Sequence, residues 1–118
     1  MISLLVDEAY AFDYLSILEI KAKISDQFIS NYNDCCEHIK LQLSSDFNTI
    51  INSEEYLNLI CANQKTFNMV DKAKFNKCSA QDVDKCNYER YKAKVALQKK
   101  FFNKSLSEQK IGYEIYKK

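Results

Sequence analysis

Apolar residues recur every three to four positions in four stretches of the chain, the spacing that places them on one face of an α-helix. These stretches run from about Ser3 to Ile24, from Asp26 to Leu43, from Ser53 to Lys77 and from Ser79 to Phe101. The second stretch continues to Ile51 unless Ser45 and Asp46 interrupt it, because both side chains compete for backbone hydrogen bonds. The pattern therefore predicts four helices.

Polar residues at the start of these stretches supply helix-capping chemistry. Ser53 is followed by two glutamates, whose carboxylates favour the positive end of a helix dipole. Ser79 is followed by Asp82 at the third helical position, which is close to the capping-box pattern. Both signals place a helix start where the apolar spacing begins.

The composition agrees with a helical fold. The 118 residues include no Pro and one Gly, whereas strand-rich folds need many turns that depend on Gly or Asn. We therefore predict an all-α fold, a single helical domain over residues 1–118 arranged as an antiparallel bundle of about four helices. A further capping signal at residues 105–108 predicts a short C-terminal helix over about residues 106–116, with an extended tail as the alternative.

Several function classes do not fit this sequence. No uncharged apolar stretch approaches 18 residues, so we expect no membrane-spanning helix. The first residues lack the basic region and the long apolar run of a signal peptide, which indicates a cytoplasmic protein with five free, buried cysteines. A single glycine cannot form a glycine-rich phosphate loop, and no catalytic motif is present. We expect no cofactor.

The first predicted helix is apolar on nearly all sides. Leu4, Tyr14 and Leu18 share one face, whereas Leu5 and Phe12 lie on the opposite side. A helix of this kind is either central to a fold or shared with a partner chain. In so short a chain, this pattern favours a homodimer that forms through the first helix.

Charge is unevenly distributed along the chain, although the formal net charge is only +1. Residues 1–70 carry four Lys and ten Asp or Glu, a net charge of −6. Residues 71–118 carry thirteen Lys or Arg and six Asp or Glu, a net charge of +7. The basic half either binds an acidic partner or faces the acidic half within the fold or a dimer, and the second interpretation is favoured.

Two charged residues fall on apolar faces. Asp7 lies between Leu4 and Leu18 on the first predicted helix, and Arg90 lies on the apolar stripe of the fourth. A buried charge needs a partner of opposite sign, so we predict a buried polar pair of Asp7 and Arg90.

The most ligand-dense run of the sequence contains Asp34 and His38, four residues apart on one helix. That spacing can chelate a metal ion, but His38 lies at the solvent border of its helix and the chain has no Glu-x-x-His motif of the ferritin-like kind. We predict no metal site and keep Asp34 and His38 as candidates. A carboxylate-based metal or small-molecule site near Asp7, Glu8 and Arg90 is the alternative.

Lys85, Lys92 and Lys99 recur every seven residues on the fourth predicted helix, with Tyr88 and Tyr91 beside them. A basic stripe with aromatic neighbours is compatible with phosphate contact and base stacking on nucleic acid. The single Arg and the sequence pI of about 7.5 favour a solvated lysine face instead.

The hypothesis that these patterns favour is a non-enzymatic helical interaction or assembly module that self-associates. A nucleic-acid accessory protein that uses the lysine stripe is one alternative. A helical bundle with a carboxylate-based site is the other.

Overall fold

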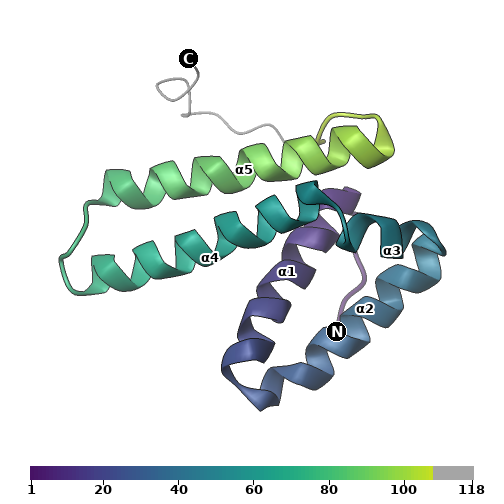
Figure 1. The fold of residues 1–118 in the computed structure, drawn as a ribbon, viewed down its shortest axis with the longest axis horizontal. Coiled ribbons are helices and arrows are strands. Elements are labelled where there is room, and N and C mark those ends of the chain that lie inside the picture. Colours follow the sequence, from purple (N-terminus) through teal and green to yellow (C-terminus); the bar gives the residue numbers. More distant parts are fainter. Residues whose placement is uncertain (108–118) are drawn as a thin grey trace.

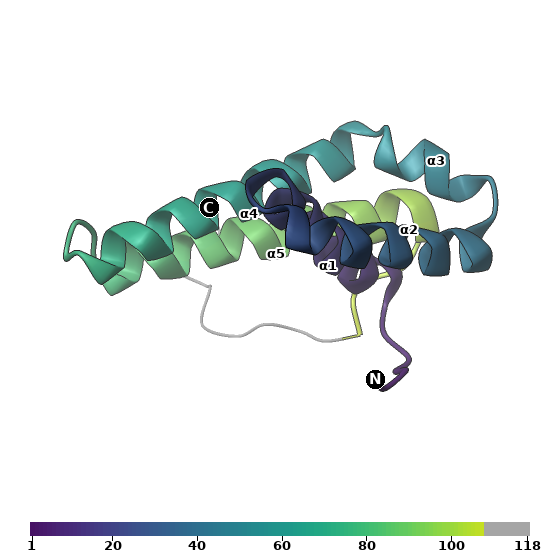
Figure 2. The same cartoon turned by 90° about the horizontal axis from the view of Figure 1, so that it is seen from below.

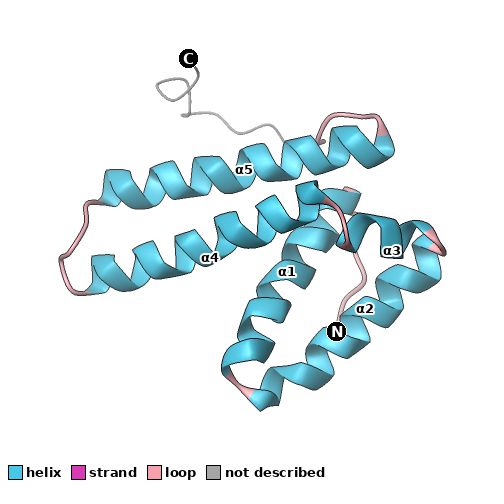
Figure 3. Ribbon diagram, in the orientation of Figure 1, coloured by secondary structure: helices cyan, strands magenta, loops and turns pink. Residues whose placement is uncertain are grey.

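The computed structural model describes residues 1–107, and within them it contains helices and loops but no strand (Figure 3). Apolar residues at helical spacing therefore form helices, and the predicted all-α class is confirmed. The α-helices are α1 (Glu8–Ile24), α2 (Ile29–Leu43), α3 (Asp46–Ile51), α4 (Glu54–Lys74) and α5 (Ala80–Phe102), with a short 3-10 helix η1 (Asp26–Phe28) before α2.

The helices form two hairpins that the short α3 connects. Figure 1 shows α4 and α5 side by side and antiparallel, while α1 and α2 form a second hairpin inclined to the first. Helix α1 is the central element, because it packs against α2, α4 and α5 (Figures 1 and 2). The bundle thus consists of two crossed hairpins, and its long helices do not share one axis.

The predicted caps form as the sequence indicates. The hydroxyl of Ser53 accepts a hydrogen bond from the backbone N–H of Tyr56 at 3.1 Å. Ser79 and Asp82 form both bonds of a capping box, at 3.2 and 3.0 Å. Helix α5 ends at Asn103, which adopts the left-handed conformation with φ 50° that favours Asn or Gly after a helix.

One helix start differs from the prediction, and the possible break after Leu43 is present. Helix α1 begins at Glu8, five residues after the predicted start at Ser3, and Asp7 is its extended N-cap residue. The break between α2 and α3 lies at Ser44, whose φ of 53° is incompatible with a continuous helix. The predicted C-terminal helix over residues 106–116 lies outside the described residues, apart from residues 106 and 107, which are not helical.

The apolar core surrounds Phe12 of α1. Its ring stacks on Phe47 of α3 with ring centroids 6.2 Å apart and meets the edge of Tyr56 of α4 at 6.1 Å. Fully buried leucines from α1, α4 and α5 complete this core: Leu15, Leu59 and Leu97. In the described range, every helix is too short or too polar to cross a membrane.

The apolar residues of α1 are largely buried within the same chain. Phe12, Leu15 and Ile20 are covered, whereas Tyr14 and Ile24 remain exposed. The sequence left two roles open for an all-round apolar helix, and the fold gives α1 the central one.

Candidate functional site

A buried carboxylate, Asp13, lies where α1 meets α4 and α5. Its Oδ1 accepts a hydrogen bond from Asn63 Nδ2 at 2.8 Å, and its Oδ2 accepts one from Arg90 Nη2 at 3.1 Å. Lys94 Nζ lies 4.0 Å from the same Oδ2. Only 8% of Asp13 is exposed, so both cations meet it largely away from water.

Ser16 and Asn63 extend this polar cluster. The Ser16 hydroxyl donates to the backbone carbonyl of Asp13 at 2.7 Å and accepts from Asn63 Nδ2 at 2.6 Å. Lys94 Nζ also lies 4.7 Å from the centre of the Tyr10 ring, a cation–π distance. Polar groups of three helices thus meet around one carboxylate.

Gln98 continues the same line of contacts toward the start of α1. Its side-chain oxygen accepts from the backbone N–H of Ala9 at 2.8 Å, and its amide nitrogen donates to Glu8 at 2.8 Å. The N–H of Ala9 is in the first turn of α1, where no intrahelical acceptor is available. Burial raises the pKa of Glu8, but the Gln98 bond and the charge of Lys104 at 3.6 Å outweigh burial and lower it.

The spacing of the donors explains why α5 supplies them together. Arg90, Lys94 and Gln98 are four residues apart and therefore share the face of α5 that meets α1. Arg90 Nε is the one buried side-chain nitrogen or oxygen in residues 1–107 that has no hydrogen-bond partner. Both Asp13 oxygens accept hydrogen bonds, so the cluster links the three helices.

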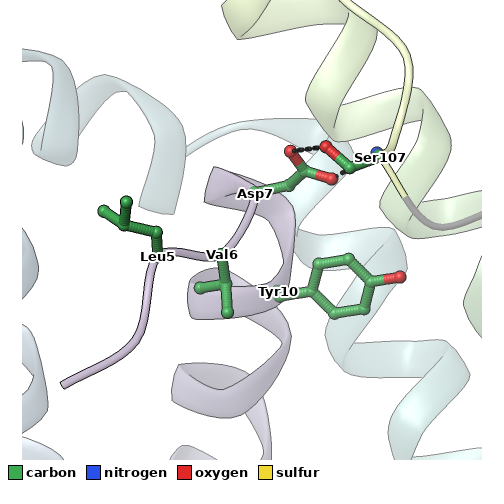
Figure 4. A pocket seen from close by; sticks show the side chains of 5 residues that line it. All are labelled: Leu5, Val6, Asp7, Tyr10 and Ser107. Atoms are coloured by element: carbon green, nitrogen blue, oxygen red, sulfur yellow. Dashed lines mark hydrogen bonds between the residues drawn. The ribbon is translucent and has the colours of Figure 1, made fainter.

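The structure does not bring Asp7 and Arg90 together. Because α1 starts at Glu8, Asp7 is at the end of the helix and not on its buried face. Its carboxylate accepts hydrogen bonds from the backbone N–H and the hydroxyl of Ser107 (Figure 4). Arg90 pairs with Asp13 instead, and the repeated polar spacing on α5 was the signal that could have identified this cluster.

Asp34 and His38 are exposed on α2 and line a shallow surface hollow of about 120 Å³ with Glu37 and Leu41. Among the described residues, no three His, Cys, Asp or Glu side chains are grouped closely enough to hold a metal ion. The same finding covers the metal version of the alternative carboxylate site around Asp7, Glu8 and Arg90.

The five cysteines are free, but they are not all buried as predicted. Cys86 is buried and Cys61 is exposed, while the other three are half-buried. Burial raises the pKa of Cys35 to about 11, which keeps its thiol protonated at neutral pH.

The carboxylate of Glu19 on α1 accepts hydrogen bonds from the hydroxyls of Tyr32 and Tyr56 at 3.2 and 3.4 Å.

The lysine stripe lies on the outer surface of α5. Lys85, Lys92 and Lys99 are all exposed. Lys92 Nζ lies 5.1 Å from the centre of the Tyr88 ring and 3.2 Å from Glu89. The stripe is therefore accessible, although an acidic neighbour partly neutralises its middle position.

Residues 1–6, which we call the arm, precede α1 without helical structure and project away from the helices (Figure 2). Five of these residues are apolar, and their side chains are more than half exposed: Met1, Ile2, Leu4, Leu5 and Val6. The sequence prediction missed this feature because it assigned the same leucines to the first helix.

Two hollows border the arm. A pocket of about 410 Å³ is lined by Leu5, Val6, Asp7, Tyr10 and Ser107 (Figure 4). A second, of about 230 Å³, which we call the α1–α2 pocket, has walls from the arm and from both helices of the first hairpin: Leu4, Leu5, Val6, Glu8, Ala11, Phe12, Ile39, Gln42 and Leu43. Exposed apolar residues and an apolar hollow thus lie next to each other.

Comparison with protein-family models, with curated proteins and with solved structures finds no match for this chain. The functional argument therefore depends on the residues and their geometry.

Proposed function

We propose that this chain is a helical interaction and assembly module that associates with a second copy of itself. The observation that carries the proposal is the arm, whose five apolar side chains are more than half exposed. Contiguous apolar surface of this kind is uncommon on monomeric proteins and typically marks an interaction site. The internal pairing of the Asp13 cluster supports a structural role for the polar groups of the interior.

The energetic gain from covering the arm is large enough for association. Burying one aliphatic side chain contributes about 1.5–3 kcal/mol. Five such residues in each arm therefore supply on the order of 10 kcal/mol per arm before the entropy cost of association is subtracted. We therefore expect residues 1–6 to form part of the interface. The sequence analysis had favoured the first helix, which these residues precede, as the dimer face.

Sedimentation equilibrium of the full chain tests this function. Across concentrations from low to high micromolar, we expect a rise from the 13.8 kDa mass of one chain toward twice that value. Apolar contacts gain strength in sulfate, whereas ion pairs are screened by salt, so sodium sulfate should strengthen the dimer. A strict monomer over the whole range, with or without sulfate, contradicts the proposal.

A second candidate function is contact with nucleic-acid phosphates through the lysine stripe. The exposure of Lys85, Lys92 and Lys99 on α5 favours it. We expect retardation of a single-stranded probe at low salt and its loss when all three lysines are replaced by alanine. Lys65, Lys72 and Lys74 are exposed on α4, and their triple replacement is the matched control. Absence of retardation at low salt contradicts this candidate.

A further inference from the structure

We propose that the arm of one chain inserts into the α1–α2 pocket of a second copy, and that the two copies exchange arms reciprocally. This inference deepens the proposed self-association and rests on it. It assigns the partner, a second copy, and the contact that joins the two.

The arm borders its own pocket without filling it. Leu4 and Val6 line the rim, yet 76% and 56% of their surfaces are exposed, and Leu5 is fully exposed. The side chains that α1 and α2 contribute are mostly apolar, among them Phe12 and Ile39, with Glu8 and Gln42 as the polar members. The volume of about 230 Å³ lies below the roughly 300–1,000 Å³ of typical small-molecule sites, so it suits one or two inserted side chains.

The adjacency of arm and pocket fits two-fold symmetry. Most homodimers use an interface in which the same patch of both subunits is self-complementary. When an apolar donor and its acceptor are neighbours on one chain, a two-fold axis beside them places each arm over the other pocket. Both arms are then covered by a single closed contact, with none left to extend the assembly.

The area that such an exchange buries reaches the size of a stable interface. Each aliphatic side chain removes on the order of 100 Å² of apolar surface from water. The ten apolar arm residues of a dimer supply about 1,000 Å², and the two small pockets add much less. The total, on the order of 1,000 Å² or somewhat more, is at the lower end of standard-size interfaces.

Charge at the base of the arm is partly compensated within each chain. Asp7 is hydrogen-bonded to Ser107, and Glu8 is paired with Gln98 and Lys104 of its own chain. Glu8 therefore meets a second copy as part of an ion pair, whereas Asp7 is hydrogen-bonded but keeps its negative charge. The Asp7 bonds also fix the point at which the arm leaves the helices, which reduces the entropy lost when the arm is ordered.

Sedimentation equilibrium of two variants tests the exchange. The double substitution L4S/L5S makes the arm polar, and Gln42→Trp places a large ring at the mouth of the pocket, where Gln42 is exposed. We expect each variant alone to raise the dimer dissociation constant at least about 100-fold. The controls are L41S/L57S, which replaces two exposed leucines elsewhere, and Gln27→Trp, at an exposed position outside the pocket. Both controls should dimerise like the wild type.

Mixing the two variants provides a second readout. The Q42W chain keeps its arm, and the L4S/L5S chain keeps the walls of its pocket that α1 and α2 supply. The mixture should therefore form heterodimers more tightly than either variant forms homodimers. Two misfolded variants could not restore dimerisation when they are mixed. Circular dichroism of each variant measures whether its helix content is unchanged.

The outcomes separate the exchange from the proposed function. A monomeric wild type overturns both. A dimeric wild type whose L4S/L5S variant also dimerises overturns the exchange and leaves self-association intact. A dimer that is lost in L4S/L5S but kept in Q42W overturns insertion into the pocket, because the arms then pair elsewhere.

Discussion

The polar cluster around Asp13 lies inside the helices, whereas the apolar arm of residues 1–6 lies outside them. Both regions reverse the usual distribution of residue types between core and surface. The buried charge of the Asp13 cluster is compensated within one chain, because Asn63, Arg90 and Lys94 surround the carboxylate. The arm has no such cover in its own chain. Buried polar groups here are paired within the fold, whereas the exposed apolar groups are the basis of the proposed association.

Removing the centre of the cluster should produce the largest effect on stability. Asp13→Ala leaves Arg90 and Lys94 without the carboxylate they share, and we expect the free energy of unfolding to fall by about 3 kcal/mol. Urea unfolding followed by circular dichroism measures this change. Asp71→Ala is the control, because Asp71 forms an exposed ion pair with Lys74, and it should change stability by less than about 0.5 kcal/mol. Equal losses in both variants would show that the cluster does not stabilise the fold.

Gln98 offers a smaller test of the same region. Gln98→Leu removes the acceptor of the Ala9 N–H and the donor to Glu8, and leaving such buried groups unpaired costs about 1–3 kcal/mol. Hydrogen exchange at the Ala9 amide should accelerate more than exchange in α4. The matched change Gln81→Leu, at an exposed position of α5, should leave both stability and exchange unchanged. Unaltered protection of Ala9 in Gln98→Leu contradicts this role.

Alkaline pH should weaken the interior between α1, α2 and α4. Burial raises the pKa values of Tyr32, Tyr56 and Cys35 in the folded chain, so the unfolded chain loses these protons first. Their contribution to stability is complete below about pH 9 and decreases as pH rises toward 11, by at most about 1.4 kcal/mol per pH unit for each group. Urea unfolding at pH 8 and pH 10.5 should show a smaller decrease for Tyr56→Phe than for the wild type. Identical decreases for the two proteins argue against a contribution from Tyr56.

The smallest effect on monomer stability should come from the arm. Leu5→Ser alters a fully exposed side chain, so unfolding measured at a concentration where the chain is monomeric should change by less than about 0.5 kcal/mol. Leu15→Ala, in the fully buried core of α1, should cost about 2–5 kcal/mol under the same conditions. A large destabilisation by Leu5→Ser would mean that the arm packs on its own chain, and the contrast with the Asp13 cluster would disappear.

The sequence predicted correctly those features, such as helix caps, that depend only on residues close together in the chain. Ser53 and Ser79 cap α4 and α5 as predicted, because a cap involves groups only a few positions apart. The start of α1 was misplaced, because the apolar residues of the arm continue the helical spacing of the helix itself. Apolar spacing predicts which residues would share one face of a helix. It does not predict whether that face packs against another part of the protein.

The residue pattern alone was enough to predict the all-α class, the main helices and the chemical types that meet: a carboxylate on the first helix and Arg90 on the last. Tertiary structure alone decided that the carboxylate is Asp13 and not Asp7, since the choice depends on the crossing of α1 with α5. It also decided that α1 is central and the arm is exposed. The physical reason is that helix formation and capping are local, whereas burial depends on contacts between residues far apart in the chain.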